Sequence, residues 1–464
     1  MRNRAYRSTA VKQVVLAEVI SRLAEGPLIC GLDVGKETVL CVVRDSKGYF
    51  ERPWKVKNPD EIPDLIEQLR TLAQTGPVQV ALESTGTYGD ALRQSLGDAG
   101  LEVRRVSGKA TSDYAEIFDG VPSAHDGKDA AVVAELAALG KSAAWPLLAL
   151  PAWQAQMKVE VTWLDTQQEI LQMWGGQLEA LLARHWPEVT KFFAFPSSTQ
   201  LKMLAHYGGP AALAADTQGI ERLSRWGGRF LKTEKIHAVC NSAGKTVGVR
   251  QNEATSDLVK RVAQEALNTK AELRATRRRL KELAKNDPVI RAQTPVVGAL
   301  TACVLRVSVG DPRDYSCGAA YRKAMGLNLK ERSSGKYQGQ LKITKRGSSR
   351  ARRWLYFAGL RAIQKSPLKS WYAAKKLKDK QRGKMAVVAV MRKLALALYA
   401  VATRDEPFSP ERLLSKPSNV KSRKQTSSGK QEAKRSQPRT KGSSLQKGLS
   451  PTAKHEVSVG GAAK

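Results

Sequence analysis

Short apolar runs separated by turn residues follow one another along the first part of the chain. Runs of this length with glycine or Ser-Lys-Gly between them predict strands, and apolar residues at three- and four-residue spacing predict helices. The first three runs form a meander, and helices then alternate with the later strands. We therefore expect an α/β domain over residues 27–150. Its expected strands are residues 28–33, 38–43, 49–56, 78–83 and 101–106, and its expected helices are residues 59–72 and 88–96.

The segment before this domain, residues 1–26, is predicted to be an N-terminal extension. Its apolar stretch from Val14 to Leu23 contains Glu18 and Arg22. These charges interrupt any signal-peptide core, and the stretch is too short to span a bilayer. We interpret it as a surface helix, and we expect no membrane association.

Two long apolar stripes at helical spacing dominate the middle of the chain. One covers residues 151–187, and the other covers residues 253–286, which begin near a Thr-Ser-Asp cluster and stop before Pro288. Stripes of this kind suit an antiparallel helical pair or a contact between subunits. A mostly helical insert joins them, so residues 151–288 are predicted to be a helical, coiled-coil region.

The rest of the chain divides into a compact part and a tail. Residues 289–412 are basic and contain further helical patterns, at residues 354–363 and 385–401. Residues 413–464 are rich in Ser, Gly, Gln and basic residues and contain no aromatic side chain. A segment of this composition buries too little apolar surface to offset its ordering entropy. We expect a disordered basic tail there.

The charge of the chain narrows its class of partner. Lys and Arg number 77 against 43 Asp and Glu, a formal net charge of +34. Such a charge favours a dense polyanion as the binding partner, and nucleic acid is the first candidate. It argues against an enzyme that acts on small neutral substrates. The five cysteines form no Cys-x-x-Cys pair, so neither structural zinc nor a disulfide framework is expected. A reducing cytoplasm follows.

Four acidic residues in the α/β domain are candidates for a metal site. Asp33 follows one apolar strand, Glu83 closes another, and Asp126 and Asp129 would share one face of a helix. Carboxylates that face a polyanion require a cation between them, and oxygen ligands suit two Mg²⁺ ions, with Mn²⁺ as a substitute. Two other interpretations stay open: strand-end carboxylates often serve turns, and residues 126–129 could form a helix N-cap.

Several short blocks, in this order, resemble the insertion-sequence 110 family of DEDD transposases. Three blocks in the α/β domain contain the four carboxylates: residues 31–36, 81–88 and 125–130. The later blocks are Asp311–Tyr315, Ala324–Leu327 with Ser333–Gly335, Ile343–Gly347 and Met391–Leu394. The resemblance covers most of residues 27–412.

The resemblance implies both a fold class and a chemistry. The fold is an α/β RuvC-like (ribonuclease H-type) N-terminal domain, a long helical pair and a mainly α-helical C-terminal transposase domain, residues 289–412. The four carboxylates would bind metal, and Ser334 would be the nucleophile that forms a covalent phosphoserine link to DNA. Judged from the sequence alone, a Ser-Ser-Gly loop is an ordinary turn, and no His lies near Ser334.

The resemblance also implies partners. Members of this family are thought to pair with donor and target DNA through a noncoding bridge RNA, and a composite site would need a homodimer or homotetramer. Basic runs suit contacts with phosphate groups, although such faces are often merely solvated. The candidate nucleic-acid-binding residues are Arg274, Arg277, Arg278, Lys342, Lys345, Arg346 and Arg350.

The sequence therefore predicts a transposase or recombinase of the prokaryotic cytoplasm, associated with the nucleoid, that excises and inserts a mobile element. Two alternatives stay open. One is a RuvC-like junction-resolving endonuclease without serine chemistry, and the other is a non-catalytic nucleic-acid-binding protein. Substitution of Ser334 separates the first alternative from the transposase, and substitution of Asp33 separates the second.

Overall fold

The computed structural model describes residues 7–84, 86–120, 125–145, 150–194, 196–331, 333–334, 337–339, 341–404 and 406–414. The chain divides into two units, Met1–Phe408 and Ser409–Lys464. Of the second unit the structure describes one short helix, α18 (Pro410–Leu414). The predicted disordered tail therefore lies, from residue 415 onward, outside the described residues.

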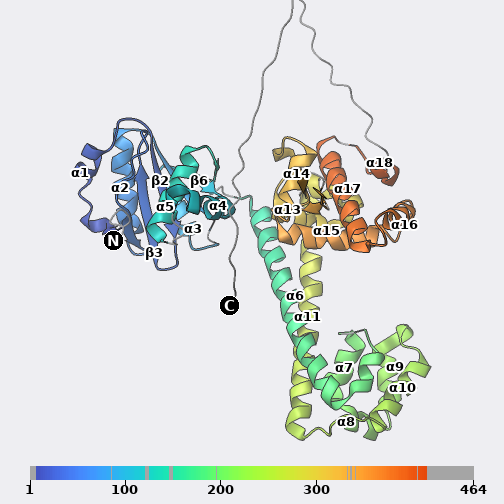
Figure 1. Ribbon diagram of the computed structural model, residues 1–464. Helices are drawn as coiled ribbons and strands as arrows, with labels where there is room; N and C mark the ends of the chain where they lie inside the picture. The colour runs from blue at the N-terminus through green and yellow to red at the C-terminus, as the bar shows by residue number, and fades with distance from the viewer. Residues whose placement is uncertain are drawn as a thin grey trace, which may run out of the picture. The chain divides into compact units, whose positions relative to one another are not determined.

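A seven-stranded mixed sheet forms the core of the α/β part (Figure 1). In spatial order its strands are β1 (Thr9–Ala10), β4 (Trp54–Lys57), β3 (Thr38–Arg44), β2 (Leu28–Val34), β5 (Val78–Glu83), β6 (Glu102–Val106) and β7 (Ser142–Ala144). Strands β2, β3 and β4 form an antiparallel meander, and β2, β5 and β6 run parallel. The edge strand β1 is parallel to β4, and β7 is antiparallel to β6. The predicted meander and the strands that follow it are confirmed.

Helices cover both faces of this sheet. Helices α2 (Ile62–Thr75) and α3 (Asp90–Asp98) share one apolar cluster with strand residues such as Leu32. On the opposite face, α4 (Gly108–Asp119) and α5 (Asp126–Ala138) pack around Ala81 and the neighbouring strands. Strands buried on both faces read as continuous apolar runs, which is why the sequence revealed them.

The third predicted strand, residues 49–56, is shorter in the structure and begins only at Trp54. The carboxylate of Asp45 accepts hydrogen bonds from the backbone amides of Lys47 and Tyr49, both at 2.9 Å. These bonds close a turn directly after β3, and Phe50 then pairs with Arg44 only as an isolated bridge, so the regular strand begins later.

The N-terminal segment belongs to the α/β core. Strand β1 extends the sheet beside β4, and the side chain of Val11 is fully buried. The expected surface helix is α1 (Leu16–Arg22), which buries Val19 against the same cluster. The segment outside the family resemblance therefore stabilises an edge of the sheet.

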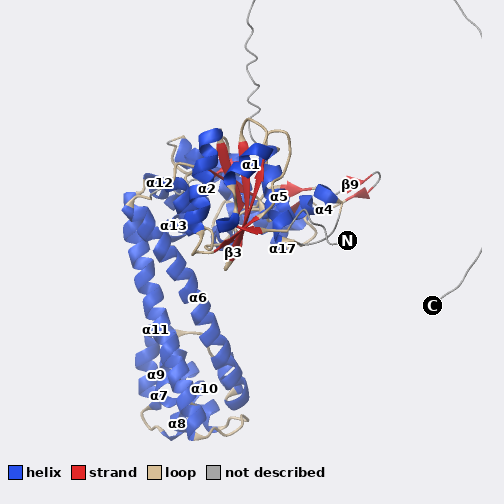
Figure 2. Cartoon of the chain, turned by 90° about the vertical axis from the view of Figure 1, so that its left-hand side faces the viewer, coloured by secondary structure: helices blue, strands red, loops and turns tan. Residues whose placement is uncertain are grey.

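Two antiparallel helices, α6 (Ala152–His185) and α11 (Glu253–Leu283), form the middle of the chain (Figure 2). Trp163 Nε1 donates to Glu272 Oε1 at 3.0 Å, and Arg279 Nε donates to Glu160 at 2.8 Å. Residue numbers thus rise along one helix as they fall along the other, and the predicted helical pair is confirmed. Four helices between them share an apolar core with one end of the pair: α7 (Ser198–Tyr207), α8 (Pro210–Ala215), α9 (Gly219–Gly227) and α10 (Thr233–Gly244).

The C-terminal part is mainly helical, with two small two-stranded sheets. Its helices are α12 (Pro288–Val297), α13 (Ala299–Val309), α14 (Gly318–Ala324), α15 (Ser349–Ala362), α16 (Leu368–Lys378) and α17 (Gly383–Thr403). The sheets pair β9 (Ser333–Ser334) with β10 (Tyr337–Gln338) and β8 (Leu329–Lys330) with β11 (Lys342–Ile343). Helix α17 is long and apolar enough to cross a membrane by length and composition. However, it buries a stripe that includes Val390 and Leu398 among the neighbouring helices, as the core helix of a globular domain does.

Candidate active site

Two carboxylates stand at the ends of neighbouring parallel strands. Strands β2 and β5 pair in a register that places Leu32 beside Leu82. The next residue on each strand is Asp33 and Glu83, so these two side chains leave the sheet side by side. Because side chains alternate along a strand, they point away from the face that Leu32 covers, toward the face on which α5 packs. The strand ends thus present two acids to the start of one helix.

Helix α5 brings the other two carboxylates to the same place. Asp126 and Asp129 lie in its first turn, three residues apart, and so share a face. The helix lies directly on Gly31 of β2: a Cβ atom there would stand 2.1 Å from the carbonyl oxygen of Ala130. Only glycine permits this approach, which holds the first turn of α5 over the carboxyl end of β2.

The electrostatics show that the four carboxylates act on one another. Burial raises the pKa of Asp33 to about 6, and repulsion from Asp129, Asp126 and Glu83 contributes to the rise. Burial also raises the pKa of Asp129, again with repulsion from Asp126 and Glu83. The structure therefore gathers the predicted acidic residues into one mutually repelling set, a frequent property of functional sites.

The start of α5 does not use these acids as its cap. The N-cap residue is His125, whose Nδ1 accepts the backbone N–H of Gly127 at 3.2 Å. Lys128, in the same turn, is almost fully buried and donates to Asp119 Oδ1 at 2.6 Å. The N-cap is therefore His125 rather than one of these acids, and Asp126 and Asp129 lie in the first turn, where the helix dipole favours negative charge.

Helix α4 holds Glu83, through residues that the sequence did not reveal. Thr111 Oγ1 is buried and donates to Glu83 Oε2 at 2.6 Å. A Cβ atom on Gly108 would lie 2.1 Å from the other carboxylate oxygen of Glu83. Glycine at the start of α4 thus makes room for the Glu83 side chain, and the threonine one turn later fixes its orientation.

The donor chemistry of this set fits a hard divalent cation. All the ligand atoms that the four residues offer are carboxylate oxygens, which Mg²⁺ prefers. Burial and the neighbouring negative charges disfavour the ionised carboxylates, and a bound cation would offset that repulsion. Within the described residues, no three Asp, Glu, His or Cys side chains converge closely enough to hold one metal ion. Small side-chain rotations on this fixed backbone would therefore have to complete any metal site.

The structure places Ser334 on a different kind of element. It belongs to the two-residue strand β9 and pairs with Tyr337 of β10 in antiparallel register, so only two residues connect the strands. The residue is exposed. The predicted nucleophile is thus displayed on a small hairpin, and Gly335 beside it lies outside the described residues.

The predicted nucleic-acid-binding residues fall into two groups. Six are exposed: Arg274, Arg277 and Arg278 on α11, and Lys342, Lys345 and Arg346 on or after β11. Arg350 is different, because its Nε donates to the buried carboxylate of Asp165 on α6 at 2.6 Å, and Arg353 bonds the same carboxylate. This arrangement ties α15 to the helical pair, so Arg350 already has an anionic partner within the protein.

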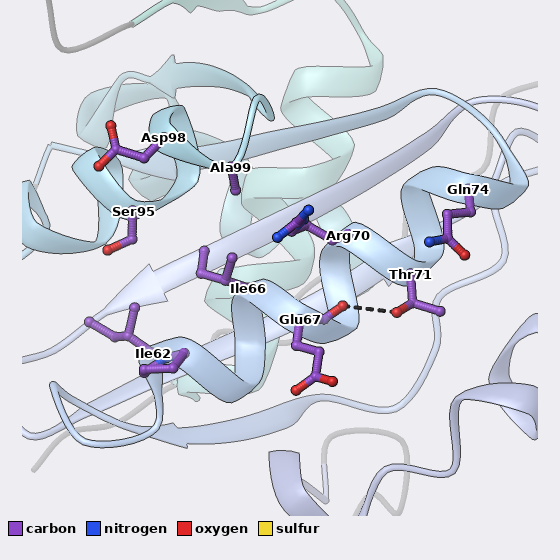
Figure 3. Close-up of a pocket in the computed structure, with 10 residues that line it drawn as sticks. Ile62, Ile66, Glu67, Arg70, Thr71, Gln74, Ser95, Asp98 and Ala99 are labelled. Atoms are coloured by element: carbon purple, nitrogen blue, oxygen red, sulfur yellow. Dashed lines mark hydrogen bonds between the residues drawn. The ribbon is translucent and has the colours of Figure 1, made fainter.

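A pocket outside these sites lies between α2 and α3 (Figure 3). Ile62, Ile66 and Arg70 line it from one helix, and Ser95 and Asp98 line it from the other. It contains none of the predicted site residues, and its walls offer no converging set of ionised groups.

Comparison with known protein families gives a match for the C-terminal part and another for the α/β domain. Residues 292–373 match a family profile described as "Transposase IS116/IS110/IS902 family". Residues 30–147 match a second profile, described as "Transposase", of the DEDD type of IS110. The chain is similar to IS110 family transposases in both of these parts, and the matches support DNA transposase activity.

Relatives of this transposase align with most of its length. An IS110 insertion-element protein of Streptomyces coelicolor is 23% identical over 396 residues, which is 82% of this chain and 95% of the relative. An IS900 insertion-element protein of Mycobacterium paratuberculosis is 24% identical over 399 residues, 83% of this chain and 98% of the relative. A putative pre-16S rRNA nuclease of Salinibacter ruber is 28% identical over 109 residues, 21% of this chain and 75% of that protein.

The likeness to these transposases implies DNA cleavage and rejoining as the activity and DNA as the substrate. DEDD transposases generally use divalent metal ions, and the carboxylates of β2, β5 and α5 are the described residues whose chemistry suits them. The α/β domain with its mixed sheet agrees with a ribonuclease H-like transposase.

Proposed function

We propose that the transposase cuts and rejoins DNA with two chemical groups, a magnesium-binding carboxylate set and a serine nucleophile. Asp33, Glu83, Asp126 and Asp129 would hold two Mg²⁺ ions, and Ser334 would attack the phosphodiester. The observation that supports this most is the pKa of Asp33, raised to about 6 by burial and by three neighbouring carboxylates. A protein retains such repulsion where a cation or a proton is part of the function.

The serine step conserves the energy of the broken bond. Ser334 Oγ bonds to phosphorus, the P–O bond to the leaving strand breaks, and the serine proton passes to a base. Asp33, through a carboxylate oxygen that no cation holds, would accept that proton. Bound divalent cations would stabilise the charge that develops on the phosphate oxygens. The phosphoserine link then permits rejoining without ATP.

In this proposal the two groups meet as a composite site. Ser334 stands exposed on a hairpin, and the carboxylates belong to the α/β domain. A homodimer or homotetramer in which one subunit presents Ser334 to the carboxylates of another would supply both, with the α6–α11 pair as a suitable contact between subunits.

The proposal includes a guide RNA. The exposed Arg274, Arg277 and Arg278 on α11, and Lys342 and Lys345 in the C-terminal part, offer cations to a structured RNA as well as to DNA. The net charge of +34 supports association with the nucleoid in a prokaryotic cytoplasm.

A covalent-adduct assay tests the serine. The protein is mixed with labelled donor and target DNA, Mg²⁺ and RNA transcribed from the flanks of the element, and DNA bound to protein is resolved on a denaturing gel. We expect an adduct with the wild-type protein and with Ser333→Ala, the matched control, and none with Ser334→Ala. Omission of the RNA should abolish cleavage if the guide is required.

A junction-resolving nuclease that uses the same carboxylates is the second candidate. The likeness of the chain to a putative pre-16S rRNA nuclease supports it. It predicts nicked DNA without an adduct, and cleavage that Ser334→Ala leaves unchanged. A non-catalytic nucleic-acid-binding protein would instead show no Mg²⁺ dependence and no effect of Asp33→Asn.

A further inference from the structure

Several arginines of the C-terminal part have an acceptor within the protein. Arg306 Nε donates to Asp287 at 2.9 Å, and Arg361 donates to the hydroxyl of Thr301 at 3.0 Å. Arg352 donates to two backbone carbonyls. Such bonds satisfy the donors of a half-buried guanidinium and offset its removal from water.

Among the described residues, Nε of Arg322 on α14 and Nε of Arg392 on α17 find no such acceptor. Both are half-buried, and the Nε atom of each is buried without a hydrogen-bond partner. Helices α14 and α17 pack together, and the two guanidinium groups are close enough for Arg322 to act on Arg392. Burial, and then the positive charge of Arg322, lower the pKa of Arg392. In the part of the chain that the structure describes, neither side chain makes an ion pair.

We propose that Arg322 and Arg392 together bind one phosphate group of the DNA backbone. Two half-buried cations that repel each other leave donors unused until an anion lies against both. A phosphate oxygen accepts several hydrogen bonds at once and carries the charge that neutralises the pair. Arginine suits this task because its guanidinium presents several donors in a fixed plane.

The position of Arg322 within the domain favours DNA as the source of this phosphate. Helix α14 leads into β8 and the hairpin that carries Ser334. The exposed basic residues Lys345 and Arg346 adjoin the end of the same helix, because the Lys345 amide donates to the carbonyl of Gly326 at 3.1 Å. Arg322 therefore lies on a helix whose end adjoins exposed basic residues and which leads along the chain to the serine hairpin. The inference needs DNA binding, not serine chemistry, so either can fail without the other.

Salt-dependent DNA binding tests the pair. Full-length protein is titrated with a labelled DNA duplex at salt concentrations from about 50 to 200 mM. We expect the double variant Arg322→Gln/Arg392→Gln to bind about tenfold more weakly and to lose about one unit from the slope of log K against log salt. The control is Arg313→Gln, which removes the same charge from an arginine already paired with Asp311. An equal loss in the control would overturn the proposal.

Thermal unfolding separates ligand binding from a structural role. Without phosphate, Arg392→Gln should melt at or above the wild-type temperature, because it removes a repulsion; a lower melting temperature contradicts the proposal. Inorganic phosphate should raise the melting temperature of the wild type more than that of Arg392→Gln. Arg392→Lys should retain part of the DNA affinity. A structured RNA that loses affinity in the double variant, while DNA does not, would overturn the assignment to DNA.

Discussion

The carboxylate site and the serine hairpin are built on opposite principles. Asp33 and Glu83 leave a sheet that is buried on both faces, and α5 is pressed onto that sheet at Gly31. Ser334 lies exposed on a strand of two residues. The fold thus fixes the backbone that carries the acidic set, whereas in our proposal DNA or another subunit places the serine of the hairpin.

This difference has a consequence for how substitutions act. Rigid elements hold catalytic groups to a fraction of an ångström, and a small displacement there lowers the rate steeply. A hairpin that is positioned by its partner keeps its activity more easily when other residues of its strands are substituted. It loses that activity when the reacting residue is replaced. We therefore expect substitutions around the carboxylates to act through geometry, and substitutions in the hairpin to act mainly through Ser334 itself.

The largest expected effect is that of Asp33→Asn. Removing the carboxylate at the centre of the set takes away a metal ligand and the base we propose, so the cleavage rate should fall by at least about 10³-fold. The measurement is single-turnover cleavage of labelled DNA in Mg²⁺. Asp98→Asn, which removes an exposed charge at the end of α3, is the control and should leave the rate unchanged. Equal rates for Asp33→Asn and wild type would exclude the carboxylate mechanism.

Gly31→Ala should have the next largest effect. A methyl group there would stand 2.1 Å from Ala130 O, so α5 must move away from β2 and carry Asp126 and Asp129 with it. A displacement of this size should lower cleavage about 10²-fold. The readout is the cleavage rate, with circular dichroism to show that the protein is folded.

Gly97→Ala, at a helical position with open space around it, is the matched control and should keep full activity. If Gly31→Ala folded and cleaved DNA as fast as the control, the helix would not be what positions the acids.

The sequence could predict the strands and the acids at their ends, because both follow from local pattern. Continuous apolar runs mark buried strands, and an acid after such a run is conspicuous in a basic chain. The supports of the site could not be predicted in this way. Gly31 is needed because of a helix that begins almost a hundred residues later, and its spacing from Ala130 exists only in the folded chain.

Long-range polar contacts were hidden for the same reason. Arg350 was predicted to meet nucleic acid, yet it bonds Asp165, which is far away in the sequence and looks like any acid on a helix. Thr111 likewise shows no signal until Glu83 is seen beside it. Local pattern predicts which elements form, whereas partners of this kind are decided by packing.

Thr111→Val should have a moderate effect. The substitution keeps the shape of the side chain but removes the hydroxyl that donates to Glu83, so Glu83 would lose its orientation and the cleavage rate should fall about tenfold. Cleavage at several Mg²⁺ concentrations is the measurement, and raised Mg²⁺ should restore part of the rate.

The control for this change is Thr71→Val. Thr71 lies on α2, and its hydroxyl bonds only the carbonyl of Glu67 in its own helix (Figure 3). A loss of activity in Thr71→Val as large as in Thr111→Val would show that the effect is one of stability rather than of Glu83.

The smallest expected effect is on stability and depends on pH. The pKa of Asp33 rises from an ordinary value of 3.8 to about 6 on folding, so the folded protein binds the proton more tightly than the unfolded chain. The free energy of unfolding therefore decreases as pH rises through this window, is unaffected by Asp33 below it, and carries the full penalty above it. In buffer without divalent cations, Asp33→Asn should raise the melting temperature at neutral pH and leave it unchanged well below the ordinary pKa of 3.8. After allowance for the partial exposure of Asp33, the gain should be about 1 kcal/mol.

Mg²⁺ should raise the melting temperature of the wild type more than that of the variant. A variant that is less stable at neutral pH would mean that Asp33 is held by favourable contacts, and the carboxylate site would then resemble an ordinary polar core.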